Sequence, residues 1–278
     1  MFSSQTMRLF WWNEKKLQGK TKENYGDLLG LYLVEKISDK KVVWANPSKF
    51  SIANFFNPIY VTIGSILTQV TTNCIVWGSG IISKDYKIKE AKFLAVRGPQ
   101  TRAHLLSQGF NVPEIYGDPA LLLPRFYKPE IKKKYALGIV PHYKDFSFIS
   151  EKFGNDDGVL IIDLLTNDIE ETTNQFLQCE AIVSSSLHGI IVAHAYGIPA
   201  VWQKFSNDVF GDDIKYQDYF ESIDLKPYSS SVLNKKSTIE DLKALLSEKP
   251  SVPKPEIIDA LCDGLMRICP FKNEIENG

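Results

Sequence analysis

The sequence predicts an α/β protein built from two Rossmann-like domains whose parallel sheets face a cleft. Short apolar, β-branched runs alternate along the chain with segments of helical periodicity, as in parallel strands joined by helices. The runs are continuously apolar, which is typical of strands buried on both faces. The pattern restarts after a proline- and lysine-rich stretch at 124–135. We therefore predict an N-terminal domain over 1–128 and a C-terminal domain over 129–278.

The individual elements follow from the same pattern. The N-terminal MRLFWW predicts a first strand, and β-branched runs predict seven more, at 41–45, 59–64, 74–80, 92–98, 136–142, 159–163 and 181–185. Helical spacing is clearest at 26–37, 99–110 and 168–180. Two further helices are predicted at 238–249 and 254–268, the second with a proline in its first turn. We expect these C-terminal helices to complete the second domain or to cross back to the first.

Composition excludes several classes of protein. The 278 residues are 44% hydrophobic and 23% charged, which is enough apolar material for a folded core. With 32 basic and 33 acidic side chains the net charge is −1, so no nucleic-acid partner is expected. No apolar run approaches the roughly 20 residues of a membrane span, and the N-terminus does not resemble a signal peptide. The four cysteines form no CxxC pair, which favours reduced thiols and a cytoplasmic protein.

The strongest candidate site follows the last predicted strand. Ser184, Ser185 and Ser186 lead into His188 and Gly189 at the start of an apolar helix. Hydroxyls and free amides at a helix N-terminus bind anions, and an imidazole there can donate a hydrogen bond or a proton. Serines are also common helix caps, and the histidine could be structural. The whole cluster after a buried strand favours a site.

Arg97 is the second candidate. It ends a predicted strand immediately before a Gly-Pro turn, where its guanidinium could grip a carboxylate or phosphate in bidentate fashion. The alternative is a structural arginine paired with an acid of the neighbouring domain.

Weaker signals come from turns and from single polar residues at the ends of strands. Glycine permits close approach to a ligand but also simply makes turns. The GSG turn lacks the GxGxxG pattern of nicotinamide sites, and no phosphate-binding GKS/T loop occurs. Asn24, Asp27 and Asp118 could equally build turns and helix caps. The candidates for the cleft are Asn24, Gly26, Asp27, Gly64, Ser65, Gly78, Ser79, Gly80 and Asp118.

The remaining histidines and aromatic residues add little. His142 ends the first strand of the second half and could face the cleft, whereas helical spacing places His194 away from His188 and predicts a structural role. No metal site is predicted, because His142 and His188 bring no carboxylates at ligand spacing. Aromatic residues such as Trp11, Trp12, Phe55 and Phe56 could stack on a sugar or touch lipid, although packing is their commoner role.

Seven motifs, taken in order over residues 24 to about 220, resemble the polysaccharide pyruvyltransferase family, and most of all its bacterial exopolysaccharide branch. They are NYGDLLG, VWGSGI, AVRGPQTRAHL, YGDPALLLP, GIVPHY, SSSLHGIIVAHAYGIPAVW and KYQDYF. The resemblance implies a two-lobed fold similar to the GT-B glycosyltransferases. It also implies transfer of the enolpyruvyl carbons of phosphoenolpyruvate onto two sugar hydroxyls, giving a cyclic ketal and phosphate without a cofactor. The implied acceptor is a lipid-linked oligosaccharide at the cytoplasmic membrane face, with peripheral membrane contact.

The resemblance also assigns residues. His188 would be the catalytic residue and Arg97 an anion ligand. Many family members carry arginine immediately before Leu-His-Gly, whereas this chain has Ser186. The expected ligands of phosphoenolpyruvate are therefore Arg97, Ser184, Ser185, Ser186, Gly189, His142 and Lys215. The base that deprotonates the sugar is left open between Asp27, Asp118 and His142.

Two other functions remain open from the sequence. A nucleotide-sugar-dependent glycosyltransferase of GT-B type would share the inferred architecture, since fold does not fix function. A non-catalytic anion-binding subunit of polysaccharide assembly would bind the donor without turnover.

Overall fold

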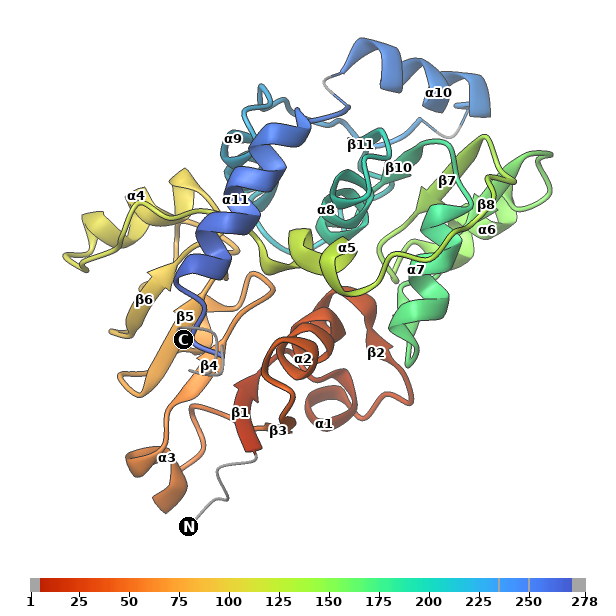
Figure 1. The fold of residues 1–278 in the computed structure, drawn as a ribbon. Coiled ribbons are helices and arrows are strands. Elements are labelled where there is room, and N and C mark those ends of the chain that lie inside the picture. Colours follow the sequence, from red (N-terminus) through yellow and green to blue (C-terminus); the bar gives the residue numbers. More distant parts are fainter. Residues whose placement is uncertain (1–5, 235, 250, 272–278) are drawn as a thin grey trace.

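The computed structural model describes residues 6–271, apart from 235 and 250. The outer ends of both predicted domains, 1–5 and 272–278, lie outside the described residues. Two parallel sheets dominate the fold (Figure 1). The first has the order β3-β1-β4-β5-β6 and the second β11-β10-β7-β8. The strands are β1 Thr6–Phe10, β3 Lys41–Trp44, β4 Ile59–Val61, β5 Cys74–Trp77, β6 Lys92–Ala95, β7 Leu137–Val140, β8 Val159–Ile161, β10 Ile182–Ser184 and β11 Ala200–Trp202.

Helices connect most of these strands. The α-helices are α1 Glu14–Gln18, α2 Tyr25–Ser38, α3 Ile52–Phe56, α4 Pro99–Ser107, α5 Leu123–Phe126, α6 Phe146–Phe153, α7 Ile169–Leu177, α8 Leu187–Ala195, α9 Ile214–Ser222, α10 Ile239–Glu248 and α11 Pro255–Arg267. Two 3₁₀ helices are η1 Leu67–Gln69 and η2 Pro119–Leu122. In the described part of the chain no helix has the length and apolarity needed to cross a membrane.

Both sheets are covered on both faces, as the continuous apolar runs predict. In β10, Ile182 packs into the core cluster that contains α8, while Val183 packs on the opposite face with residues of α6 and α10. In β1, Leu9 and Phe10 likewise enter two different clusters. Because neighbouring residues of a strand point to opposite faces, a strand with two buried faces must be apolar throughout. The predicted parallel α/β architecture is confirmed.

The two halves share a core. The largest apolar cluster combines residues of α2 with residues of α7 and α8. A small antiparallel sheet, β2 (Glu23–Asn24) with β9 (Leu165–Thr166), also joins the halves. The sequence did not predict β2, β9 or β11; β2 and β9 are two residues long, too short for an apolar run to stand out. The organisation into two separate GT-B-like domains stays a prediction.

The C-terminal helix returns to the first half. Figure 1 shows α11 running from the second sheet back toward β4 and β5. The Trp77 indole N–H donates to the Leu265 carbonyl of α11 at 3.0 Å. The Phe271 ring packs against both Trp77 and Tyr60 of the first sheet. Of the two arrangements expected for the C-terminal helices, α11 adopts the crossing one.

Candidate functional site

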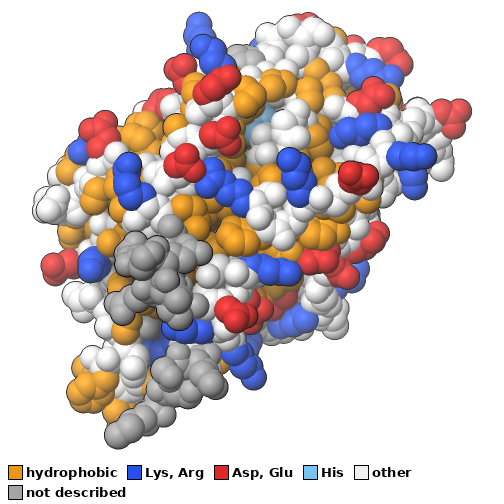
Figure 2. All heavy atoms as spheres, in the orientation of Figure 1, with side chains coloured by type: hydrophobic (Ala, Val, Ile, Leu, Met, Phe, Trp, Pro, Cys, Tyr) orange, Lys and Arg blue, Asp and Glu red, His pale blue; other side chains and the backbone are white. Residues whose placement is uncertain are grey.

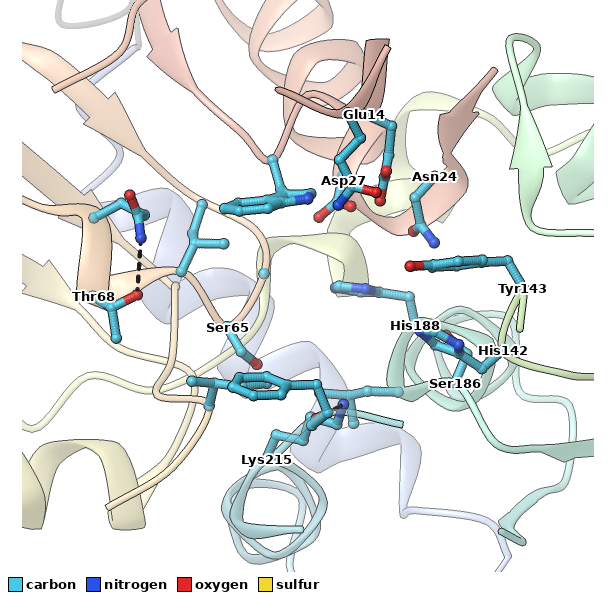
Figure 3. Close-up of a pocket in the computed structure, with 18 of the residues that line it drawn as sticks. Glu14, Asn24, Asp27, Ser65, Thr68, His142, Tyr143, Ser186, His188 and Lys215 are labelled. Carbon is cyan, nitrogen blue, oxygen red and sulfur yellow. Dashed lines mark hydrogen bonds between the residues drawn. The ribbon is translucent and has the colours of Figure 1, made fainter. Parts of the chain in front are cut away.

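A cavity of about 570 Å³ lies between the two halves and is lined by residues of both. Parallel sheets place their ligands beyond the carboxyl ends of their strands, which is where the cavity lies. Figure 3 shows the walls converging on His188. The predicted residues that line it are Asn24, Asp27, Gly64, Ser65, His142, Ser185, Ser186, His188 and Lys215.

His188 is the second residue of α8 and projects into the cavity (Figure 3). Its Nε2 atom lies 3.5 Å from the Asp118 Oδ2 atom, and the exposed fractions of the two side chains are 12% and 0%. Within the described part of the chain, neither atom has a hydrogen-bond partner, so the contact is electrostatic in this geometry. The other carboxylate oxygen of Asp118 accepts the Ala120 N–H at 3.0 Å. Asp118 therefore caps η2, as the turn interpretation predicts, and faces the imidazole as well.

Gly26, in the first turn of α2, makes room for this imidazole. A β-carbon at this position would collide with His188 Nδ1, Cγ and Cβ. Asn24, the residue before α2, caps the helix by accepting the Gly26 N–H at 3.0 Å. The NYGD motif therefore brings the start of α2 into contact with His188.

The three serines before α8 make different contacts, and only Ser185 and Ser186 line the cavity. The Ser184 hydroxyl is buried, donates to the Val140 carbonyl at 2.8 Å and accepts the Ser186 N–H at 2.9 Å, so it shapes the turn. Ser185 lines the cavity, and its hydroxyl accepts the His142 N–H at 2.8 Å. Ser186 is the N-cap residue of α8 but makes no side-chain cap bond. The first-turn N–H groups of α8 are therefore not capped by the Ser186 side chain and can hydrogen-bond an anion.

Lys215 provides a cation at the wall of the cavity. Burial, with the nearby Arg97 charge, lowers the pKa of Lys215 to about 8, so its amine is mostly charged at pH 7. Burial and the charges of Lys215, Lys144 and Lys20 lower the pKa of His142 to about 4. His142 is therefore neutral at pH 7 and serves the site as a polar rather than a cationic group.

Carboxylates form the opposite wall, where Figure 3 shows Glu14 and Asp27 above His188 and away from Lys215. Burial, reinforced by the charges of Glu14 and Glu23, raises the pKa of Asp27 well above its ordinary value. Glu14 is itself buried and pairs with Lys20 at 2.8 Å. The cavity thus has a cationic wall and an acidic wall, with His188 between them.

Arg97 is buried, whereas the sequence predicts that it is exposed to the cavity. Its side chain is 0% exposed, and Nε donates to Asp218 Oδ2 at 2.9 Å. The other guanidinium nitrogens donate to the Ser65 hydroxyl at 2.6 Å and the Ile81 carbonyl at 2.8 Å. The structure thus has the alternative arrangement, an ion pair with an acid of the other half. Arg97 reaches the cavity only through Ser65.

The turn Gly78-Ser79-Gly80 and Gly189 were expected to contact a ligand. They instead lie behind the residues that line the cavity. The Ser79 hydroxyl donates to the Gly64 carbonyl at 2.7 Å. β-Carbons on Gly78, Gly80 and Gly189 would collide with Pro119, Arg97 and Ser184 respectively. These positions need glycine for packing of protein against protein.

Glu14, Tyr143 and Phe210 are among the lining residues that the sequence does not single out. Tyr143 adjoins the predicted His142, which is the only local signal for it. Glu14 and Phe210 follow no motif. His194 is buried and its Nδ1 lies 3.0 Å from the Tyr219 hydroxyl, the structural role predicted for it. Among the described residues, no three His, Cys, Asp or Glu side chains are grouped to hold a metal ion.

Fold and cavity together define a parallel α/β protein with a histidine–aspartate pair set between Lys215 on one side and the carboxyl groups of Glu14 and Asp27 on the other. The sequence profile of the family described as Polysaccharide pyruvyl transferase matches residues 24–202. An uncharacterized protein of Acanthamoeba polyphaga mimivirus is 37% identical over 203 residues, covering 70% of this chain and 69% of that protein. The chain belongs to the polysaccharide pyruvyl transferase family, so it is a transferase that acts in polysaccharide pyruvylation.

Proposed function

We propose that the chain transfers the enolpyruvyl carbons of phosphoenolpyruvate onto two hydroxyls of one sugar, forming a cyclic pyruvate ketal and releasing phosphate. Family membership supports pyruvyl transfer to a polysaccharide. The observation that carries the mechanism is the His188–Asp118 pair between a cationic and an acidic wall. Phosphoenolpyruvate as the donor is part of this proposal. So is the acceptor, a lipid-linked oligosaccharide precursor bound at the cytoplasmic face of the membrane.

The donor anion lies against the cationic wall. Phosphoenolpyruvate carries a carboxylate and a phosphate, which need converging N–H and cationic groups. Lys215, the first-turn N–H groups of α8 and the Ser185 and Ser186 hydroxyls supply them. They take the place of the arginine that precedes Leu-His-Gly in many family members. Arg97 contributes indirectly, by holding the Ser65 hydroxyl at the wall.

His188 acts as the general acid. The first sugar hydroxyl adds to the substituted carbon of the donor, while the methylene carbon takes a proton from His188 and becomes the ketal methyl group. Since Nε2 is buried against Asp118, Nδ1 is the ring nitrogen available to the donor. The Asp118 carboxylate faces Nε2 and fixes the orientation of the ring.

The second half of the reaction closes the ring. The bond from carbon to the phosphate oxygen breaks, and phosphate leaves with the electron pair. The second sugar hydroxyl then attacks the same carbon and loses its proton, which balances the charge of the departing phosphate. Asp27 accepts the proton of the first hydroxyl, because its raised pKa makes the carboxylate a stronger base, and this proton returns to His188 at the end of the cycle. The sugar lies along the acidic wall, where Trp12 and Tyr143 offer ring faces.

Incubation of the protein with phosphoenolpyruvate and an oligosaccharide acceptor tests the proposal. We expect mass spectrometry to detect one added pyruvate ketal for each phosphate released. Consumption of a nucleotide sugar instead, from a panel offered in parallel, would establish a glycosyltransferase. Donor binding without ketal would establish a non-catalytic subunit.

A further inference from the structure

A cluster of large apolar side chains is exposed on α3 and on the loop before it. Phe50, Ile52, Phe55 and Phe56 are 85%, 75%, 68% and 81% exposed. The rings of Phe50 and Phe55 pack edge to face with centroids 5.7 Å apart, so the side chains form one surface. We call these four residues the α3 patch. Figure 2 shows apolar side chains gathered over α3, at the periphery of the molecule.

Hydrogen bonds fix α3 to the first sheet. The Arg8 guanidinium of β1 donates to the carbonyls of Ala53 and Asn57, at 3.0 and 2.6 Å, and to the Asn54 side chain. The Asn73 amide donates to the same Asn57 carbonyl at 2.8 Å. The patch is therefore displayed on a fixed support, although folding ordinarily buries large apolar groups and contiguous exposed ones mark interaction surfaces.

The stretch of sequence that contains the patch is basic. From Lys40 through Lys84 it has four lysines and no aspartate or glutamate. Lys49 directly precedes the patch. Figure 2 shows no acidic side chain over α3. An apolar surface next to a lysine, with no acid in its own stretch of sequence, complements an anionic interface.

We propose that the α3 patch docks on an anionic lipid bilayer. Its phenylalanine side chains enter the interfacial region of the bilayer, while Lys49 contacts the headgroups. A second copy of this chain fits less well, because a symmetric contact would set each patch and its lysine against themselves without an acid. Four projecting side chains are also far fewer than the roughly 20–30 residues that each side of a stable protein interface contributes. The inference does not depend on the chemistry of the cavity.

Sedimentation of the full-length protein with vesicles tests this docking. We expect association with vesicles of phosphatidylcholine and phosphatidylglycerol, weaker association with phosphatidylcholine alone, and loss of the difference at high salt. The triple variant Phe50→Ser, Phe55→Ser, Phe56→Ser should reduce vesicle association about tenfold or more. Lys49→Ser should weaken it by about fivefold, and only with the anionic vesicles.

A matched triple variant controls for the loss of exposed apolar groups elsewhere. Leu106→Ser, Phe148→Ser and Val252→Ser alter side chains that are 43%, 42% and 46% exposed, and this variant should bind vesicles like the wild type. Equal melting temperatures would show that both triple variants are folded. The proposal is overturned if the wild type ignores anionic vesicles, or if the α3 triple variant binds them undiminished. Self-association that the α3 variant abolishes, without vesicle binding, would assign the patch to a second copy.

Discussion

His188 and Asp118 are 70 positions apart in the sequence, yet their Nε2 and Oδ2 atoms lie 3.5 Å apart at the wall of the cavity. Asp118 caps η2 and His188 is the second residue of α8, and these two elements pack against each other. A buried carboxylate facing one ring nitrogen holds the imidazole in one orientation and fixes which nitrogen meets the ligand.

Asp118→Asn tests the pair. An asparagine oxygen can still accept the Ala120 N–H and keep the η2 cap, but it removes the charge that faces His188. We expect kcat to fall about 100-fold, with a smaller change in the KM for phosphoenolpyruvate. An unchanged kcat in the folded variant would limit Asp118 to capping η2.

Gly26→Ala should displace the imidazole. The new methyl group would occupy the position of the His188 ring, so ketal formation should fall by about 100-fold or more. Gly264→Ala is the matched control, since Gly264 also lies in a helix and its nearest atom to a new β-carbon is 3.9 Å away. The control should keep full activity and gain up to about 1 kcal/mol of stability. Normal activity of the Gly26 variant would contradict the observed packing.

Arg97→Ala should destabilise the protein. The substitution leaves the fully buried Asp218 without its cation, and removing one partner of a buried pair costs about 3–5 kcal/mol. Urea unfolding would measure this change. Arg125→Ala, which breaks the exposed pair with Asp263, should cost at most about 1 kcal/mol. Wild-type stability of the Arg97 variant together with a raised donor KM would restore Arg97 as a direct anion ligand.

Donor capture should depend on the charge of Lys215. Its amine is protonated below its pKa of about 8 and neutral above it, so affinity for an anionic donor falls as pH rises through that value. We expect kcat/KM for phosphoenolpyruvate to decline above about pH 8 in the wild type. Lys215→Arg stays charged throughout, and should move the decline to higher pH. A decline at the same pH in both proteins would assign it to another group.

The sequence is sufficient to predict the features that arise locally. Continuous apolar runs predict the parallel strands, and the Ser-Leu-His-Gly turn after one of them predicts His188 at a helix start in the cavity. Residues whose role depends on distant partners are harder to predict. Arg97 has the right residue type and the right turn for an anion ligand, but Asp218, 121 positions away, takes its guanidinium.

The roles of Asp118 and Gly26 also depend on residues that are distant in the sequence. Both are predicted as cleft residues from their turns, while their relation to His188 exists only once α2, η2 and α8 meet. Glu14 belongs to the acidic wall because it is buried beside Asp27, and nothing in its neighbouring sequence indicates this burial.

The most direct test of the central claim is ketal formation by His188→Ala, measured by mass spectrometry of the acceptor together with phosphate release. The variant should fold, bind phosphoenolpyruvate through Lys215 and the start of α8, and form ketal at least about 100-fold more slowly than the wild type. Ketal formation at a near-normal rate in a folded His188→Ala protein would contradict the assignment of His188 as the general acid.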